Sequence, residues 1–148
     1  MDSTASTVPQ PVLTVGIPAF NAGRSIERSI RSILRQTWCG TMEILVVDDG
    51  STDDTLQVCA TYAANMDVFY FRLEDKQLGE WRDSAAFLNM GISFAIHALG
   101  AERVIPTHPE IVPGIHTFAA INAAPDGIDF VMFRGYYLPV ELQLRYEA

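Results

Sequence analysis

The sequence is poor in basic residues, and Lys76 is its only lysine. It has 10 Lys and Arg against 18 Asp and Glu, which gives a formal net charge of −8 at pH 7. A protein that holds DNA or RNA by the phosphates needs a basic face to displace counterions, so no nucleic-acid partner is expected. An acidic chain can still bind a diphosphate locally, through a cation, a helix N-terminus or one placed arginine.

Long apolar runs and paired cysteines are also missing. No run approaches the roughly 20 apolar residues that cross a bilayer, so no transmembrane segment is expected. Residues 1–11 have neither the basic start nor the apolar core of a signal peptide, and their Ser, Thr and Pro content predicts a flexible tail. The two cysteines, Cys39 and Cys59, form no CxxC pair, which favours free, buried thiols in a cytoplasmic protein.

What remains is typical of one globular domain, residues 12–148, with 49% hydrophobic and 19% charged residues. Strand and helix patterns alternate along it. Strands are expected at 13–17, 43–47, 68–72, 103–106 and 128–133, and helices at 25–36, 55–64, 83–99 and 115–123. We expect Pro18 to end the first strand. This alternation predicts an α/β fold, a mostly parallel sheet with helices on both faces.

Two of the expected helices carry a pattern that predicts how they pack. In residues 25–36 the apolar residues Ile26, Ile30 and Ile33 recur at helical spacing, with arginines on the opposite face. Residues 83–99 contain small residues at Ala85, Ala86, Gly91 and Ala95 that would let this helix lie close to the sheet.

Three polar loops follow strands and should meet at one edge of the sheet. They are PAFN at 18–21, DDGS at 48–51 and THPE at 107–110. Ligands of open parallel sheets bind beyond the carboxyl ends of the strands. The sequence therefore predicts a binding site at this edge.

The acidic pair Asp48 and Asp49 is the first candidate within these loops. A carboxylate at a strand end can accept strong hydrogen bonds from a base N–H or from ribose hydroxyls. Turn and helix-capping chemistry explains residues 51–54, but it does not explain two acids before Gly50. At least one of the two is therefore expected to bind a ligand.

Phe20 and Arg82 are the next candidates, each with a plain alternative. A Phe20 ring past a strand end can stack on a nucleobase, but a core position fits the pattern equally well. Arg82, at the start of a long expected helix, could meet a diphosphate with help from the helix N-terminus, or it could be an ordinary surface residue.

His108 and Glu110 are candidate metal ligands, because both could face the same way in an extended segment. A hard divalent cation accepts a carboxylate more readily than an imidazole, so His108 is the weaker ligand. Two ligands do not define a metal site, and an ordinary loop is the alternative. His97 and His116 are expected to be structural.

Other nucleotide-binding signatures are absent from the sequence. It has neither a GxxxxGK[ST] loop nor a GxGxxG turn. A phospho-accepting receiver domain needs acids after the first strand and a lysine at a later strand end, whereas Lys76 lies in a loop.

Three segments resemble the start of family 2 glycosyltransferases with the GT-A fold. They are TVGIPAFN at 14–21, SILRQTW at 32–38 and EILVVDDGSTDDT at 43–55, in the family's order and spacing. Residues 81–92 are similar to the family's small-residue helix before its metal motif. The resemblance covers residues 12–114.

The resemblance implies a uridine diphosphate sugar as donor. The segment Pro18, Ala19 and Phe20 would border the uracil, with Phe20 against the base, and Asn21 after it is a further candidate nucleotide-binding residue. Asp49 would accept from the uracil N–H, and Asp48 would support that loop or the ribose.

The resemblance also implies a metal and a reaction. Residues 107–110 fall where the family carries its Asp-x-Asp metal motif, which leaves Glu110 as the single acidic ligand for Mn²⁺ or Mg²⁺, with His108 beside it. The chemistry would be transfer of the sugar to an acceptor.

The same resemblance leaves two hypotheses. Full-length members continue into an acceptor-binding half with a catalytic base, and no later acid of this sequence matches that base. The chain is either a short glycosyltransferase or donor half, or an inactive glycosyltransferase-like module of a larger assembly. An apolar C-terminal segment could cover the place of the missing half, or bind a protein partner or a second copy; it comprises Tyr136, Tyr137, Leu138, Val140, Leu142 and Leu144.

Overall fold

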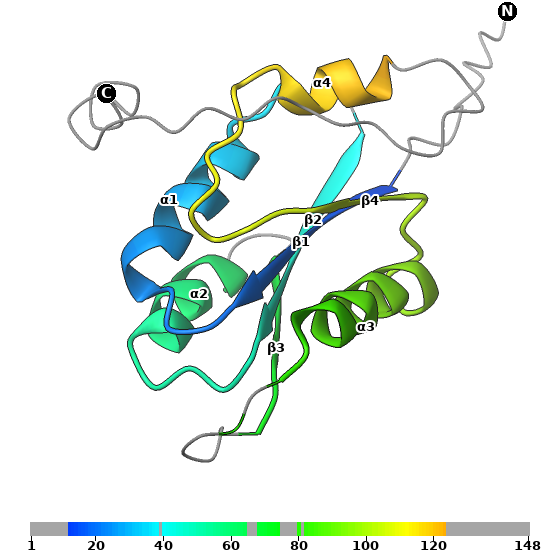
Figure 1. The fold of residues 1–148 in the computed structure, drawn as a ribbon. Helices are drawn as coiled ribbons and strands as arrows, with labels where there is room; N and C mark the ends of the chain where they lie inside the picture. The colour runs from blue at the N-terminus through cyan, green and yellow to red at the C-terminus, as the bar shows by residue number, and fades with distance from the viewer. Residues whose placement is uncertain (1–11, 39, 65–67, 75–79, 81, 124–148) are drawn as a thin grey trace, which may run out of the picture.

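The computed structural model describes residues 12–38, 40–64, 68–74, 80 and 82–123, which form a four-stranded parallel sheet flanked by helices (Figure 1). The elements are β1 (Val12–Ala19), α1 (Gly23–Leu34), β2 (Thr41–Asp48), α2 (Thr55–Ala63), β3 (Val68–Arg72), α3 (Ser84–His97), β4 (Arg103–Pro106) and α4 (Thr117–Asn122). The predicted α/β class is confirmed. The predicted strand at 128–133, the tail at 1–11 and the apolar segment at 136–144 lie outside the described residues.

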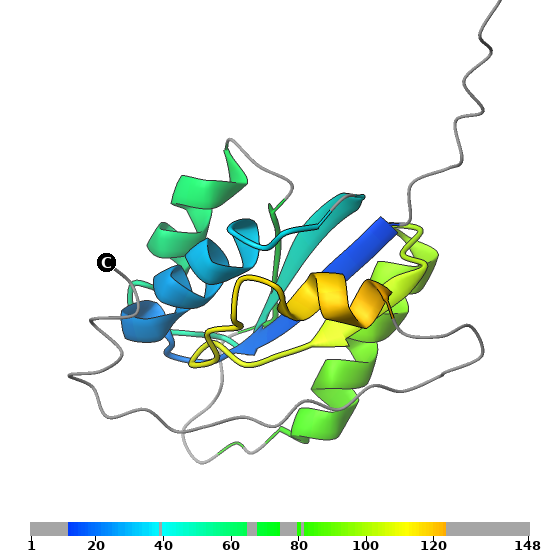
Figure 2. The ribbon, with the colours of Figure 1, turned by 90° about the horizontal axis from the view of Figure 1, so that it is seen from above.

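The strand order β3-β2-β1-β4 explains why the helices divide between the two faces. The chain first moves outward from β1 to β3 and then returns to place β4 on the other side of β1. Because crossovers between parallel strands are right-handed, this reversal changes the face on which the connecting helix lies. Figures 1 and 2 show α1 and α2 on one face and α3 on the other. The reversal also creates a switch point between β1 and β4, where ligands of such sheets bind.

Alternating side chains of the strands build a core on each face. On the side of α1, Leu13, Val15 and Ile17 of β1 and Ile26, Ile30 and Ile33 of α1 are all 0% exposed, as the helical spacing predicts. On the side of α3, Leu45 and Val47 of β2 pack with Ala95 and Ala101. Strands covered on both faces explain why β1 and β2 are nearly continuous apolar runs.

β1 continues through Pro18, so the prediction that this residue ends the strand is wrong. Pro18 is paired with Val47 of β2, while the pairing of β1 with β4 stops at Gly16. The carbonyl of Gly16 faces β4 and accepts a hydrogen bond from the N–H of Thr107 at 2.9 Å. Backbone groups two residues apart point to the same side, so the N–H that Pro18 lacks would face the side on which β4 has already ended.

α3 lies close to the sheet through some of its small residues. Gly91 is buried, and a Cβ atom added to it would lie 3.0 Å from Cγ2 of Val47. Ala95 is 1% exposed, whereas Ala86 is exposed and does not serve this contact.

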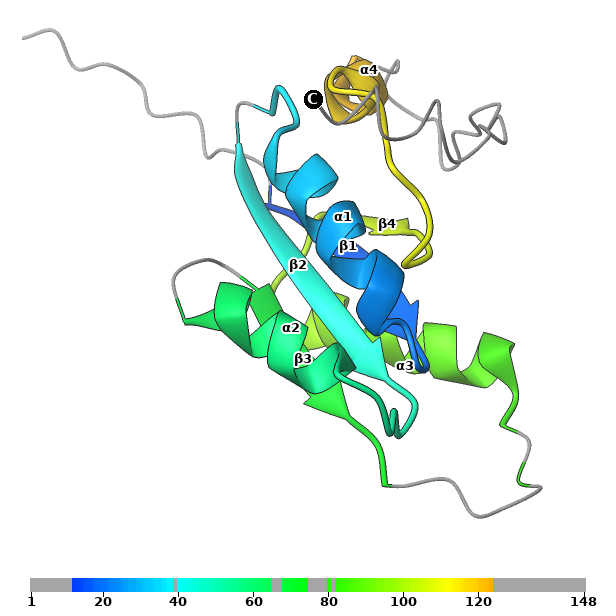
Figure 3. The ribbon, with the colours of Figure 1, turned by 90° about the vertical axis from the view of Figure 1, so that its left-hand side faces the viewer.

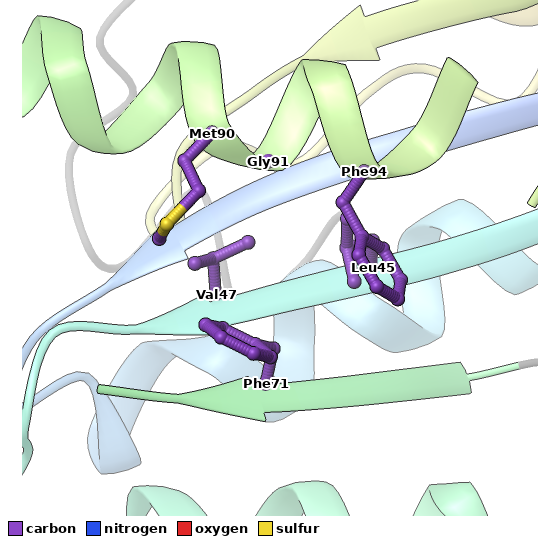
Figure 4. Close-up of a pocket in the computed structure, with 6 residues that line it drawn as sticks. All are labelled: Leu45, Val47, Phe71, Met90, Gly91 and Phe94. Atoms are coloured by element: carbon purple, nitrogen blue, oxygen red, sulfur yellow. The ribbon is translucent and has the colours of Figure 1, made fainter. Parts of the chain in front are cut away.

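An apolar hollow lies beside this contact, between α3 and the sheet. Figure 4 shows its lining, which comprises Leu45, Val47, Phe71, Met90, Gly91 and Phe94. The rings of Phe71 and Phe94 are 6.2 Å apart. No side chain that lines it carries a charge or a hydrogen-bonding group, so it is not where a diphosphate would bind. Among the described residues, no helix is long and apolar enough to cross a bilayer.

Candidate functional site

The loops after β1, β2 and β4 meet at the carboxyl edge of the sheet, as predicted. The N–H of Asp49 donates to the carbonyl of Ala19 at 2.8 Å, which joins the first two loops. The hydrogen bond from Thr107 to Gly16 brings the third loop against β1. The site is therefore positioned by backbone pairing that extends the sheet.

Asp48 is the structural centre of the loop after β2. Its carboxylate is 0% exposed and accepts hydrogen bonds from the Ser51 N–H at 2.9 Å, the Ser51 hydroxyl and the Tyr70 hydroxyl. Arg72 lies 3.9 Å from the same carboxylate. Burial raises the pKa of Tyr70, and its hydrogen bond to Asp48 raises it further, so the phenol stays a donor. Asp48 is thus placed to support the loop, the first of the two roles expected for it, and has no surface for a ribose.

The turn itself depends on Gly50, which adopts a φ of 79°. This left-handed conformation costs roughly 1–2 kcal/mol for a residue with a side chain. Gly50 therefore lets the chain reverse directly after Asp49.

Asp49 is largely buried at this edge, at 7% exposed, and is paired with Arg82. Its Oδ1 is 2.9 Å from Nη1 of Arg82, whose Nε is 2.8 Å from Oε1 of Glu80. The Asp49 side chain is 10% exposed and that of Arg82 is 20% exposed. Hydrogen bonds to Glu80 and Asp49 raise the pKa of Arg82, so the guanidinium stays charged. The structure places Arg82 beside Asp49, a position that the sequence did not indicate.

The residues at the end of β1 separate into core and surface. Ala19 is 2% exposed and belongs to the core, so only its backbone can border a ligand. Pro18 is half-buried. Phe20 is 47% exposed, which excludes the core alternative and leaves its ring at the edge of the site.

Asn21 holds the first two loops together. Its Oδ1 accepts a hydrogen bond from the N–H of Thr52 at 2.8 Å, and its own N–H donates to the Ser51 hydroxyl at 2.9 Å. Its φ is 49°, a left-handed conformation that asparagine tolerates better than most residues. These contacts assign Asn21 a supporting part in the site.

The N-terminus of α1 is capped by residues of the loop after β2. Ala22 has no capping side chain; its N–H donates to the Thr55 hydroxyl, and the N–H of Gly23 donates to Oδ2 of Asp53, each at 2.9 Å. Partial burial raises the pKa of Asp53, but hydrogen bonds from the Thr55 hydroxyl and from the N–H groups of Gly23 and Thr55 outweigh it. The pKa of Asp53 therefore lies below its ordinary value of 3.8.

His108 and Glu110 lie in a turn, so the predicted extended segment is wrong. The N–H of Ile111 donates to the carbonyl of His108 at 3.0 Å, which closes a β-turn with Pro109 in its second position. Proline fixes the φ angle that this position needs, which explains the turn. The side chains of His108 and Glu110 are exposed. Among the described residues, no three His, Cys, Asp or Glu side chains are grouped as a metal site.

The predictions for the two cysteines and for His97 and His116 have different outcomes. Cys59 is a free, buried thiol, as predicted, and burial together with the charge of Asp48 raises its pKa to about 12. Cys39 lies outside the described residues. His97 is exposed on α3, and His116 bonds through Nδ1 to the Thr37 hydroxyl at 3.0 Å.

Two buried polar residues, Ser29 in α1 and Gln36 just after it, also contact the segment that follows β4. Ser29 donates to the carbonyl of His108 at 3.4 Å, and Gln36 bonds to residues 113, 114 and 118. The sequence carries a signal for both, because they lie in phase with Ile26, Ile30 and Ile33. A polar side chain on a buried stripe needs hydrogen-bond partners.

The structure is an open, parallel α/β sheet with a carboxylate and an aromatic ring near the carboxyl ends of its strands, the edge at which sheets of this class bind their ligands. The family model of glycosyl transferase family 2 matches residues 14–96, more than half of the 148 residues. The chain therefore belongs to glycosyl transferase family 2.

Two relatives show how much of a whole enzyme this chain represents. It is 35% identical over 82 residues to the chondroitin synthase of Escherichia coli, covering 55% of this chain and 12% of the relative. It is 39% identical over 56 residues to the PGL/p-HBAD biosynthesis glycosyltransferase of Mycobacterium tuberculosis, covering 38% of this chain and 22% of the relative. The chain spans less than a quarter of the length of each.

Solved structures share the fold. S. aureus TarS superposes with a TM-score of 0.60 at 24% identity, covering 75% of this chain and 31% of that one. The mannosyltransferase PcManGT from Pyrobaculum calidifontis, in complex with GDP-Man and Mn²⁺, gives a TM-score of 0.53 at 28% identity, covering 70% and 28%. The GT-A fold predicted from the sequence is confirmed.

Proposed function

We propose that this chain is the donor-binding part of a glycosyltransferase, which binds a UDP-sugar and transfers the sugar to an acceptor. The observation that carries the proposal is the placement of Asp49. Its carboxylate lies at the carboxyl edge of the sheet, directly after β2, and its position is fixed by the backbone hydrogen bond to Ala19 and by the buried Asp48 beside it.

The chemistry of the edge suits uracil. Uracil presents an N–H donor flanked by two carbonyl acceptors. Asp49 can accept from the N–H, while Arg82, 2.9 Å from Asp49, can donate to the neighbouring carbonyl. The exposed ring of Phe20 offers a face for stacking, a contact worth roughly 1–3 kcal/mol per base. Arg82 therefore serves the base in this proposal, in place of the diphosphate.

Known complexes of related folds support a nucleotide ligand. S. aureus TarS has been solved with UDP and with UDP-GlcNAc, and PcManGT with GDP-Man. The choice of UDP for this chain rests on its own Asp49 and Arg82.

The turn after β4 fits a divalent cation shared with the ligand. Mg²⁺ sites often use one or two carboxylates and take their other oxygens from substrate phosphates and water. Glu110 would hold Mn²⁺ or Mg²⁺ in this way, with His108 as a weaker ligand that Mn²⁺ tolerates better. A bound cation would stabilise the charge of the diphosphate leaving group.

The test is calorimetric titration of UDP, with and without Mn²⁺, into the wild type and into Asp49→Asn. The substitution keeps the size of the side chain and removes its charge, so we expect UDP to bind about tenfold more weakly or worse, since a hydrogen bond to a charged group contributes about 1.5–3 kcal/mol. Glu102→Gln is the matched control, because it makes the same charge change at an exposed residue before β4. Mn²⁺ should strengthen UDP binding to the wild type.

Two outcomes contradict the proposal. Equal UDP affinity of Asp49→Asn and the wild type would remove Asp49 from the base site. Failure of the wild type to bind UDP with or without Mn²⁺ would favour the second hypothesis, an inactive module within a larger assembly. The acceptor, a protein partner or second copy at residues 136–144, and the cytoplasmic location stay predictions.

A further inference from the structure

The segment between β4 and α4 lies along α1 and is fixed to the rest of the molecule at three places. Figure 3 shows it passing beside α1 on its way to α4. The first fixed point is the hydrogen bond from Thr107 to Gly16 at the exit of β4. The second is the Ser29 hydroxyl, 3.4 Å from the carbonyl of His108. The third lies at the C-terminal end of α1.

Gln36 makes the third fixed point. Its Nε2 donates to the carbonyls of Pro113 at 3.3 Å and Gly114 at 2.8 Å. Its Oε1 accepts from the N–H of Phe118 at 3.1 Å. Gln36 is 8% exposed, so these hydrogen bonds take the place of bonds to water, which cannot reach the amide. One buried amide thus bonds both to the segment and to the start of α4.

Thr37, an exposed residue, adds hydrogen bonds at the same fixed point. Its N–H donates to the carbonyl of Ile115 at 2.9 Å, and its hydroxyl lies 3.0 Å from Nδ1 of His116. Phe118 is 2% exposed and anchors α4 in the core of the α1 face. Residues 113–118 are therefore held to α1 and to the core of its face.

Glu110 lies between the second and third fixed points. Only residues 109–112 separate the carbonyl held by Ser29 from the carbonyl held by Gln36. Because the turn is so short, its position is set by the two carbonyl groups that are held on either side of it. A carboxylate that shares a cation with a diphosphate must be held to within about 0.5 Å, so the ends matter for metal binding.

We propose that Gln36 is a positioning residue for Glu110: it fixes the segment after β4 so that the Glu110 carboxylate reaches a cation shared with the donor diphosphate. This inference rests on the proposed function, because it assumes the cation at Glu110. Gln36 acts from the far end of α1 and does not touch the nucleotide.

The experiment measures Mn²⁺ affinity in the presence of saturating UDP, and UDP affinity without metal, for the wild type and Gln36→Met. Methionine keeps the length of the side chain and removes every hydrogen bond to the segment. Loss of a group that hydrogen-bonds a metal ligand directly costs about tenfold or more in metal affinity. Gln36 acts through the backbone of the segment, so we expect Mn²⁺ to bind more weakly by up to about tenfold, while metal-free UDP affinity is unchanged. Gln57→Met is the matched control on the exposed face of α2.

Hydrogen exchange gives a readout that needs no ligand. In Gln36→Met, the amides of residues 107–118 should exchange faster, while those of residues 44–51 keep the wild-type rate. If Gln36→Met does not fold, Thr37→Val carries the same test, with an expected weakening of Mn²⁺ binding of about threefold for the loss of the exposed hydrogen bonds of its hydroxyl to Ile115 and His116.

Gln36→Glu adds a pH signature that a purely structural role would not give. The introduced carboxylate faces the carbonyls of Pro113 and Gly114, and burial raises the pKa of such a group. As the pH falls it becomes protonated and can donate to one of these carbonyls. The Mn²⁺ affinity of Gln36→Glu, relative to the wild type at each pH, should therefore recover towards acid.

Two results overturn the proposal, and they are distinguishable. Equal Mn²⁺ affinity of the wild type and Gln36→Met, with faster exchange at residues 107–118, would make Gln36 a structural anchor only. A wild type that binds UDP but no Mn²⁺ would remove the cation from Glu110, and with it both this inference and the metal part of the proposed function.

Discussion

Asp48 and Asp49 are adjacent in the chain, yet their carboxylates have opposite surroundings. Successive side chains of a strand point to opposite faces, so the end of β2 directs Asp48 into the side of α1 and α2 and Asp49 towards Arg82 before α3. The carboxylate of Asp48 shapes the turn, whereas that of Asp49, which is also largely buried, pairs with Arg82. The alternation of side chains along a strand thus gives two neighbouring aspartates different surroundings and different contacts.

Asp53 gives the residue-scale prediction for acid stability. Because its pKa is lowered in the folded state, its contribution to the free energy of unfolding is complete above its ordinary pKa of 3.8 and is lost as the pH falls through the folded pKa. We expect Asp53→Asn to lower the free energy of unfolding by about 1 kcal/mol near pH 7, because both carboxylate oxygens accept hydrogen bonds and an amide keeps only one acceptor oxygen.

Urea unfolding near pH 7 and near pH 3 checks this prediction. The difference between Asp53→Asn and the wild type should shrink at the lower pH, because below 3.8 the unfolded wild type binds a proton at this carboxyl group and the stability that comes from the lowered folded pKa begins to be lost. A difference that stays constant between the two pH values would show that the charge of Asp53 does not matter. Asp54→Asn is the control, since Asp54 makes no capping hydrogen bond.

At the scale of the elements, the sequence predicts the types and order of the eight described helices and strands. Strong periodicity makes this possible, as in the Ile26, Ile30 and Ile33 stripe of α1. Periodicity does not reveal where a strand stops pairing on one side while it continues to pair on the other. The continuation of β1 through Pro18 is therefore not predictable from the sequence. The candidate site is predictable as a set of loops, but the pairing of Arg82 with Asp49 and the turn at Glu110 depend on contacts between distant segments.

The close approach of α3 to β2 gives the element-scale prediction. A Cβ atom at Gly91 would lie 3.0 Å from Val47, so we expect Gly91→Val to lower the free energy of unfolding by about 1–3 kcal/mol through overpacking. Ala86→Val is the matched control on an exposed position of the same helix. Chemical denaturation measures both, and equal effects would show that α3 can move away from β2 at little cost.

The whole molecule is acidic, and this sets how salt should affect ligand binding. Repulsion between a chain of net charge −8 and the UDP phosphates is long-range, and salt at about 0.1 M screens it beyond about 10 Å. We therefore expect the metal-free Kd for UDP to stay within about twofold or to decrease as NaCl rises from about 0.02 M to about 0.2 M. Calorimetry at the two concentrations decides this, and a Kd that increases tenfold would indicate a basic phosphate site instead.

The capping of α1 by the loop after β2 has a consequence for the order of assembly. The first N–H groups of α1, at Ala22 and Gly23, find their partners in Thr55 and Asp53, about thirty positions later in the chain. Isolated helices of this length are marginal in water. As the chain leaves the ribosome, the first turn of α1 should fray until residues 53–55 emerge and β2 pairs with β1. The same event joins the loops after β1 and β2 through the hydrogen bond from Asp49 to Ala19, so a chain interrupted before residue 53 lacks both the cap of α1 and this part of the proposed donor site.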